Sequence, residues 1–260
     1  MAPEAPPTLF LIHGGGHGDP AYFQKFQDEL HKAEIPTETG TQPSNGGFPP
    51  RPMYNDAAYW RAEIDRLADA GKDVVVLMHS VGGVVGTEAT QGLGKAERAK
   101  RGLPGGVVHL VYLTAYLPNE GDSVFSFYGE GTLLPTRAEF RTADNGVDIF
   151  VLDPFAAYYY NDMAPEEQQH WAQYLKHSPL ELITQPVTHA TWQDIPTSYI
   201  IAELDQVILP EVQQQMVNDA KEKHGIEITT FSLPSSHSPF LSMPDRLTDV
   251  IKSIYRAIQK

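Results

Sequence analysis

Cysteine is absent from the 260 residues of this chain. Its absence excludes disulfide bridges, thiolate metal ligands and a cysteine nucleophile, and it fits an intracellular setting. The sequence also lacks any apolar run near the roughly 20 residues that a membrane span requires. The first residues have neither a basic start nor an apolar core, so we expect a cytoplasmic protein with no membrane partner.

Basic residues are scarce as well. The chain has 19 Lys and Arg against 33 Asp and Glu, which gives a formal net charge of -14. Nucleic-acid binding requires a positive surface, so we expect no nucleic-acid partner. The hydrophobic fraction of 41% and the charged fraction of 20% are typical of a globular protein, and the length suits one large α/β domain.

The most informative stretch runs from Val74 to Gly86. An apolar, β-branched run ends at Ser80, and glycines follow, which predicts a strand, a sharp turn and a helix. Such a turn strains the backbone and lifts the serine hydroxyl above the carboxyl end of a sheet. We therefore interpret Ser80 as a nucleophile, with Gly82 and Gly83 leaving it room. Met78 replaces the first glycine of the usual G-x-S-x-G, and a helix N-cap is the alternative interpretation.

A second glycine-rich stretch, residues 13–18, follows a predicted buried strand over residues 8–12. Glycine backbone can aim N–H groups at a developing negative charge, so we interpret it as an oxyanion loop. A tight turn is the alternative. A phosphate loop is disfavoured, because the terminal Gly-Lys-Ser/Thr and the G-x-G-x-x-G spacing are both missing. We expect His13 and His17 to serve loop packing rather than metal binding.

Strands and helices alternate on both sides of residues 119–193. Further strands are predicted at residues 35–39, 107–114, 197–202 and 226–233. Helices are predicted at residues 22–33, from a cap at Asn55 or Asp56 to Gly71, at 84–93, from about Pro210, and at about 245–258, with a solvated helix end at 95–101. This alternation predicts a parallel sheet whose functional groups gather at the carboxyl ends of the strands.

Residues 119–193 lose this rhythm and are dense in aromatic side chains, with a helix predicted at 165–177. Aromatic residues above the active edge suggest a lid and an apolar pocket. Alternatively, many of the rings only hold the lid together. The rings are Phe125, Phe127, Tyr128, Phe140, Phe150, Phe155, Tyr158, Tyr159, Tyr160, Trp171, Tyr174 and Trp192.

Two polar residues after later strands complete a candidate catalytic triad. A serine nucleophile requires a base within hydrogen-bond reach and a third group that orients the base. Asp205 and His237 each follow a predicted strand, so they should reach the same sheet edge as Ser80. The order Ser, Asp, His along the chain is that of α/β-hydrolases. Glu203 is the alternative orienting acid, and His189 is a candidate lid histidine.

With these residues in place, the chain from Thr8 onward resembles the α/β-hydrolase superfamily, and within it the esterase branch related to plant methylesterases and hydroxynitrile lyases. The motifs that carry the resemblance are Leu11-Ile-His-Gly-Gly-Gly-His-Gly18, His79-Ser-Val-Gly-Gly83, Leu113-Thr-Ala-Tyr-Leu-Pro118, Asp205 and Ser236-His-Ser-Pro-Phe-Leu-Ser242. The resemblance implies an α/β-hydrolase fold with a mainly parallel six-stranded sheet flanked by helices. The core would span residues 1–118 and 194–260, with a lid at 119–193.

The resemblance also implies roles for individual residues. Ser80 would be the nucleophile, His237 the general base and then acid, and Asp205 the orienting carboxylate. The oxyanion donors would be the backbone N–H groups of Gly15 and Val81. We further expect a set of residues to bind substrate: Gly14, His79, Tyr116, Phe125 and Trp192. Strand alternation, however, points His79 into the sheet.

The function expected from these residues is hydrolysis of an ester or lactone of a small apolar or aromatic molecule, without cofactor or metal. The alternative is a lyase, cyclase or thioesterase-like enzyme with the same triad, and a non-catalytic ligand receptor is a third hypothesis. Hydroxynitrile lyases of this branch have a lysine just after the catalytic histidine. Ser238 stands there in this chain, which disfavours that activity.

Overall fold

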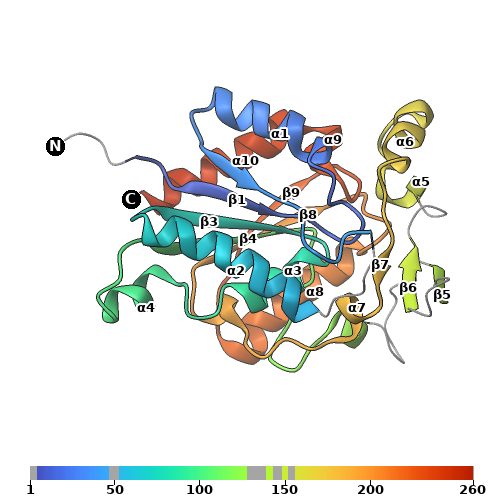
Figure 1. Cartoon of the computed structure of the whole chain (residues 1–260). Coiled ribbons are helices and arrows are strands. Elements are labelled where there is room, and N and C mark those ends of the chain that lie inside the picture. Colours follow the sequence, from blue (N-terminus) through green and yellow to red (C-terminus); the bar gives the residue numbers. More distant parts are fainter. Residues whose placement is uncertain (1–4, 47–52, 128–138, 143–147, 152–155, 260) are drawn as a thin grey trace.

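The computed structural model describes residues 5–46, 53–127, 139–142, 148–151 and 156–259. A six-stranded sheet forms the centre of the molecule, and every neighbouring pair of its strands is parallel (Figure 1). The strands in order across the sheet are β2 (Thr37–Thr39), β1 (Thr8–Ile12), β3 (Asp73–His79), β4 (Gly106–Leu113), β8 (Thr197–Ala202) and β9 (Thr229–Leu233). The expected six-stranded parallel sheet is therefore confirmed.

Helices cover both faces of this sheet. Helices α1 (Ala21–Lys32) and α10 (Pro244–Ile258) lie on one face, with the short α9 (Pro239–Ser242), while α2 (Met53–Asp69), α3 (Gly82–Ala89) and α8 (Pro210–His224) lie on the other (Figure 1). Strand β3 is consequently buried on both sides, and all five residues from Val74 to Met78 have no exposed surface. Continuous apolar runs are expected of strands covered on both faces.

Several predicted boundaries were wrong. Helix α2 already includes Met53, so Asn55 and Asp56 lie inside the helix and do not cap it. The carboxylate of Asp56 instead accepts a hydrogen bond from the backbone N–H of Ser44 at 3.0 Å and a second one from its hydroxyl. Helix α3 ends at Ala89, short of residue 93, because the chain turns at Gly92 with a φ of +71°. Strands β2 and β9 begin later than predicted.

The predicted solvated helix at residues 95–101 is helix α4 (Lys95–Lys100), but one of its basic residues is buried. Only 2% of the Arg98 side chain is exposed, and its guanidinium pairs with Asp65 and Asp69 of α2. Its Nε also donates to the carbonyl of Pro104 at 3.3 Å. Arg98 therefore fastens α4 to α2, and the expectation of a solvated charge was wrong at this position.

Residues 119–193 are here called the cap segment. The described residues between 139 and 179 lie beyond the carboxyl ends of the central strands (Figure 1), whereas Thr188 and Thr191 bond to Glu88 and Thr87 of α3. The described part of the cap segment forms a three-stranded antiparallel sheet and short helices: β5 (Glu139–Thr142), β6 (Asp148–Val151), β7 (Ser178–Pro179), α5 (Ala156–Tyr159), α6 (Pro165–Ala172) and α7 (Glu181–Thr184), with 3-10 turns at Val124–Phe127 and Thr191–Gln193. Helix α6 is shorter than the predicted helix at 165–177. Tyr128 and Phe155 lie outside the described residues, as do the side chains of Phe140 and Phe150.

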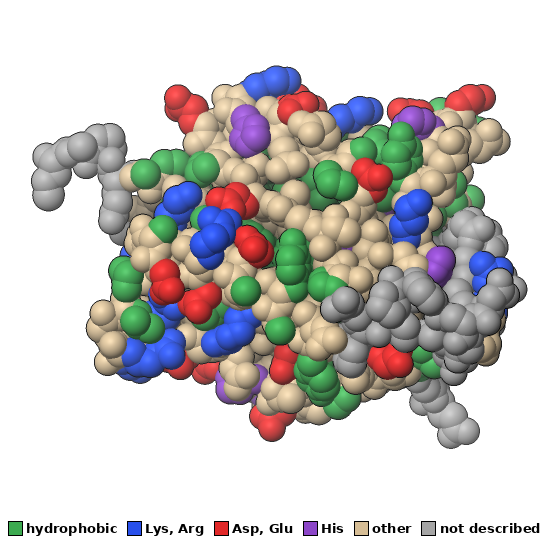
Figure 2. Space-filling model, in the orientation of Figure 1, with side chains coloured by type: hydrophobic (Ala, Val, Ile, Leu, Met, Phe, Trp, Pro, Cys, Tyr) green, Lys and Arg blue, Asp and Glu red, His purple; other side chains and the backbone are tan. Residues whose placement is uncertain are grey.

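Charged side chains of both signs are interspersed over the face shown in Figure 2. Among the described helices, none is long and apolar enough to cross a membrane.

Candidate active site

Ser80 occupies the sharp turn between β3 and α3. Its φ is +55°, a left-handed conformation that is rare for a residue with a side chain. The turn is held by the Ser80 carbonyl, which accepts hydrogen bonds from the N–H groups of Gly83 at 2.9 Å and Tyr116 at 3.3 Å. A Cβ on Gly83 would lie 2.2 Å from the Tyr116 carbonyl oxygen, so this residue must be glycine. The strain at Ser80 is thus imposed by close backbone packing on both sides.

Met78 takes the place where a glycine commonly precedes the serine turn, and the chain makes room for it elsewhere. Met78 is fully buried, and a Cβ on Gly86 would lie 2.5 Å from the Met78 sulfur. Gly86 therefore provides the space in α3 that the methionine needs. Met78 and Gly86 together allow β3 and α3 to pack closely although the first glycine of G-x-S-x-G is missing.

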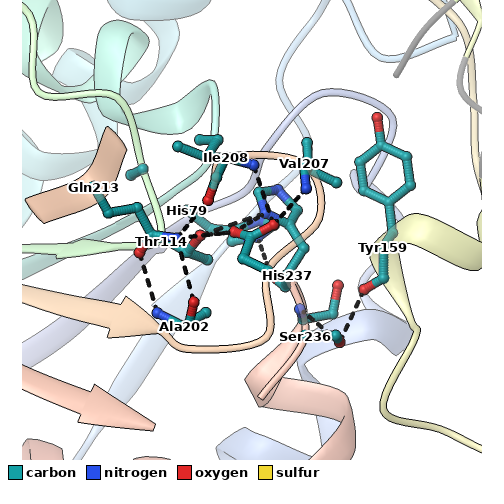
Figure 3. Close-up of polar contacts among 12 residues, drawn as sticks. His79, Thr114, Tyr159, Ala202, Val207, Ile208, Gln213, Ser236 and His237 are labelled. Atoms are coloured by element: carbon teal, nitrogen blue, oxygen red, sulfur yellow. Dashed lines mark hydrogen bonds and ion pairs between the residues drawn. The ribbon is translucent and has the colours of Figure 1, made fainter. Parts of the chain in front are cut away.

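Asp205 and His237 form a buried pair at the same edge of the sheet, and Figure 3 shows His237 with residues that surround the pair. Asp205 follows β8 and His237 follows β9, and Nδ1 of the imidazole lies 2.8 Å from Oδ2 of the carboxylate. Both side chains are fully buried. Because a carboxylate only accepts, Nδ1 donates the proton and leaves Nε2 free to take one.

The Asp205 carboxylate accepts four further hydrogen bonds. Its Oδ1 accepts from the backbone N–H groups of Val207 at 2.7 Å and Ile208 at 3.1 Å. Its Oδ2 accepts from Nε2 of Gln213 at 3.2 Å and from the hydroxyl of Thr114. Donors on both oxygens fix the plane of the carboxylate.

Glu203, the alternative orienting acid, has a different partner. Its carboxylate accepts a hydrogen bond from the hydroxyl of Ser232 on β9 at 2.6 Å and is exposed. The candidate lid histidine His189 lies near Asp194, with 2.9 Å between Nε2 and Oδ2. The geometry therefore favours Asp205 as the partner of His237.

Thr114 is a residue of this site that the sequence argument missed. It is fully buried directly after β4, with a φ of +38°, and its hydroxyl lies 3.4 Å from Nδ1 of His237 while it donates to Asp205. Its place after a buried strand, at the same edge as the other three residues, was the available signal. Gln213, in the first turns of α8, gave no comparable signal.

His79 packs against the candidate base. Its Nε2 donates to the backbone carbonyl of His237 at 2.9 Å, and the centroids of the two rings are 4.7 Å apart. Burial holds the pKa of His79 well below its ordinary value, so the ring is neutral. The residue before Ser80 is thus bonded to the backbone of His237.

The hydroxyl of Ser80 and Nε2 of His237 share no hydrogen bond, and Nε2 is buried without a partner within the described ranges. Hydrogen bonds between a nucleophile and its base are often long in ligand-free enzymes and tighten when substrate binds.

The glycine loop, residues 13–18, packs directly on the serine turn. A Cβ on Gly14 would lie 2.8 Å from the Cβ of Ser80. Nδ1 of His13 donates to the Gly14 carbonyl at 2.8 Å, which fixes the peptide that carries the N–H of Gly15. Burial lowers the pKa of His13 to about 4, so the imidazole is neutral and has one N–H to donate.

The three other residues expected to bind substrate lie in different surroundings. Tyr116 is buried with its ring centroid 5.1 Å from that of Phe127, whereas Phe125 is 41% exposed. The indole of Trp192 donates to the Pro118 carbonyl at 2.7 Å and meets the ring of His224 on α8. The described contacts of Trp192 include none with Ser80, Asp205 or His237.

A serine on a strained turn after a central parallel strand, with a buried imidazole and carboxylate at the same sheet edge, defines an enzyme of the α/β-hydrolase type. The chain matches the alpha/beta hydrolase family over residues 9–250, and it belongs to this family.

Individual relatives agree with this assignment. The chain is 28% identical over 251 residues to the alpha/beta hydrolase nvfD of Aspergillus novofumigatus, covering 95% of this chain and 96% of the relative. It is also 28% identical over 258 residues to a pyrethroid hydrolase of Sphingobium wenxiniae, covering 94% and 85%. A variant of polyneuridine aldehyde esterase shares the fold with a TM-score of 0.75 at 17% identity, covering 95% and 98%. The protein is therefore an esterase-like hydrolase.

Proposed function

We propose that the protein is a serine hydrolase that cleaves an ester or a lactone of a small, uncharged, apolar or aromatic molecule. The observation that carries the proposal is the buried 2.8 Å contact between His237 and Asp205, at the sheet edge where Ser80 occupies its strained turn. The bond from His79 to the His237 carbonyl supports it, because it ties the serine turn to the base.

The reaction would begin with attack of the Ser80 hydroxyl on the substrate carbonyl carbon. Nε2 of His237 takes the serine proton, and Asp205 stabilises the imidazolium through Nδ1. The N–H groups of Gly15 and Val81 would hold the negative oxygen of the tetrahedral intermediate. The imidazolium then protonates the leaving alcohol, and a water activated by the same imidazole releases the acid from Ser80.

The surroundings of the proposed triad favour an uncharged substrate. The rings nearest to His237 include Tyr159 and His79, and Phe240 packs on His79 at 4.9 Å between centroids. Burial lowers the pKa of His17 to about 3, so this neighbouring imidazole is neutral as well. The named activity of the pyrethroid hydrolase relative also supports a hydrolytic reaction.

The decisive experiment replaces Ser80 with alanine and measures hydrolysis of p-nitrophenyl acetate. We expect turnover to fall by a factor on the order of 10⁴ to 10⁶, because no other group can form the acyl intermediate. Ser232→Ala, which removes an exposed hydroxyl on β9, is the matched control and should keep the parent rate.

A fluorophosphonate probe should phosphonylate Ser80 with loss of HF, which adds the mass of the phosphonyl group to the peptide that contains Ser80 in the parent protein and in the control. Hydrolysis at the parent rate by the Ser80→Ala variant would reject the proposed function. Analysis of the products then separates ester hydrolysis from lyase or cyclase chemistry.

A further inference from the structure

Four consecutive residues of the cap segment, Tyr159 to Asp162, bond to three loops of the candidate site. The loops are the glycine loop, the acid loop (residues 203–209) and the histidine loop (residues 234–238). Each loop follows a different strand, and β1, β8 and β9 are not all neighbours in the sheet. The acid and histidine loops follow the neighbouring strands β8 and β9, and the N–H of Leu204 donates to the Ser235 carbonyl at 2.9 Å. The sheet alone therefore does not fix the distance from the glycine loop to these two loops.

The contact with the glycine loop runs through an imidazole. Nδ1 of His17 lies 2.8 Å from the carbonyl oxygen of Gly15, which can only accept, so Nδ1 carries the proton. Nε2 of His17 then has a free lone pair, and the hydroxyl of Tyr160 lies 3.0 Å from it. Tyr160 is fully buried, which raises the pKa of its hydroxyl well above the ordinary value and keeps it a donor.

Two acceptors lie within reach of the Tyr160 hydroxyl. The hydroxyl of Tyr22 donates its only proton to the carbonyl of Trp171 at 3.0 Å, so its oxygen can accept from the Tyr160 hydroxyl, which lies 3.4 Å away. The shorter contact of Tyr160 is thus the one with His17. The backbone N–H of Lys176 also donates to the Gly16 carbonyl at 3.1 Å, so the cap segment contacts this loop twice.

The next residues contact the other two loops. The side-chain amide of Asn161 donates to the carbonyl of Leu204, the residue before Asp205, at 3.0 Å. The Asp162 carboxylate accepts from the N–H of Ser236, the residue before His237, at 3.0 Å. The hydroxyl of Ser236 donates to the Tyr159 carbonyl at 3.1 Å (Figure 3).

We propose that Tyr159–Asp162 is a brace that holds the glycine loop, the acid loop and the histidine loop in mutual register, and that its members are positioning residues for catalysis. This inference rests on the proposed function. Oxyanion donors and the base act only when they are held at the geometry of the transition state. The cap segment thus contributes to the reaction by arranging the site.

The first test is Tyr160→Phe, which removes one hydroxyl and keeps the ring. We expect kcat for p-nitrophenyl acetate to fall about tenfold with KM changed less than about twofold, because the loss affects the transition state and not substrate binding. A boronic acid that forms a tetrahedral adduct on Ser80 should bind about tenfold more weakly for the same reason.

Tyr255→Phe is the matched control. This substitution on α10 removes another buried tyrosine hydroxyl, which donates to the Pro7 carbonyl at 3.1 Å. It should lower the unfolding temperature as Tyr160→Phe does, while kcat and boronate affinity keep their parent values. A purely structural role of Tyr160 would make the two variants behave alike.

Asn161→Ala removes a half-buried side chain and tests the contact with the acid loop. If Tyr160→Phe does not fold, this second variant tests the proposed brace. We expect kcat to fall about threefold at unchanged KM. Parent values of kcat and boronate affinity in both folded variants would overturn the brace. If Ser80→Ala is inactive in the same assay, that result leaves the proposed function intact, whereas an active Ser80→Ala variant rejects the function itself.

Discussion

The carboxyl edge of the central sheet and the cap segment that lies beyond it are built in different ways. At the sheet edge, backbone packs on backbone, and two non-glycine residues, Ser80 and Thr114, are held at positive φ. In the cap segment, the described elements are short, and large rings make many of the contacts, as where Tyr22 stacks on Trp171 with centroids 5.4 Å apart. The main chain at the sheet edge has little conformational freedom, whereas the structure of the cap segment depends on contacts between side chains.

This difference shows where catalytic precision would come from. Strain at Ser80 persists only because its surroundings leave the chain no other conformation. Ring contacts in the cap segment define a shape without fixing each dihedral angle, and hydrogen bonds of Tyr159–Asp162 and of Lys176 join that shape to the loops. The two regions should therefore respond very differently to small changes.

The largest contrast is expected between two glycines. Gly83→Ala would place a Cβ 2.2 Å from the Tyr116 carbonyl oxygen, and we expect a loss of more than about 4 kcal/mol in the free energy of unfolding, or no folded protein. Gly121, in the cap segment, has a φ of +88°, and nothing lies within 4 Å of the position that a Cβ would take, so Gly121→Ala should cost only about 1 kcal/mol.

Urea unfolding of the two alanine variants measures this contrast. Equal losses in the free energy of unfolding would show that the sheet edge accommodates an added Cβ as easily as the cap segment does. That result would contradict the difference between the two regions.

The same contrast explains what could be predicted from the sequence. The strand over residues 197–202 was predicted with its observed bounds, and that over 107–114 within one residue, because a continuous apolar run and its flanking turns are local signals. The turn at Ser80 was predicted because glycines directly follow the serine in the sequence, which is a local signal even though the backbone that Gly83 approaches, at Tyr116, is distant in the chain. All of these features belong to the central sheet and its carboxyl edge.

What could not be predicted depends on partners that are distant in the chain. Tyr160 and His17 are 143 residues apart, and no local pattern indicates that their side chains meet. The burial of Arg98 likewise depends on carboxylates about 30 residues earlier, so a basic helix looked solvated. Thr114 was the last residue of the strand predicted over residues 107–114, and only the structure shows that its hydroxyl donates to Asp205.

The next effect in size concerns the buried imidazoles at the sheet edge. Burial lowers the pKa of His13 from 6.5 to about 4, so the folded protein keeps it neutral while the unfolded chain binds a proton below about 6.5. Its contribution to stability is therefore complete above pH 6.5 and is lost as the pH falls toward 4. At pH 5 the loss should be about 2 kcal/mol for this one residue.

Urea unfolding at several pH values tests this sign and size. The drop in the free energy of unfolding between pH 7 and pH 5 should be about 2 kcal/mol smaller in His13→Gln than in the parent protein. His170→Gln, which replaces an exposed histidine of the cap segment, is the control and should leave the drop unchanged. An unchanged drop in His13→Gln would show that this imidazole is already charged in the folded state.

The smallest expected effect on stability, with a clear effect on rate, concerns Thr114. Its side chain is held at a φ of +38° and donates to Asp205, so the strain and the hydrogen bond occur at the same residue. Thr114→Val keeps the shape and the strain but removes the hydroxyl, leaving Oδ2 of Asp205 with two donors, His237 and Gln213. We expect kcat for p-nitrophenyl acetate to fall about tenfold and the free energy of unfolding to change by about 1 kcal/mol. Thr114→Ser keeps the hydroxyl and should restore most of the rate. Equal rates in the valine and serine variants would contradict this prediction. They would show that the Thr114 hydroxyl does not position Asp205, and that the backbone donors suffice to hold the carboxylate.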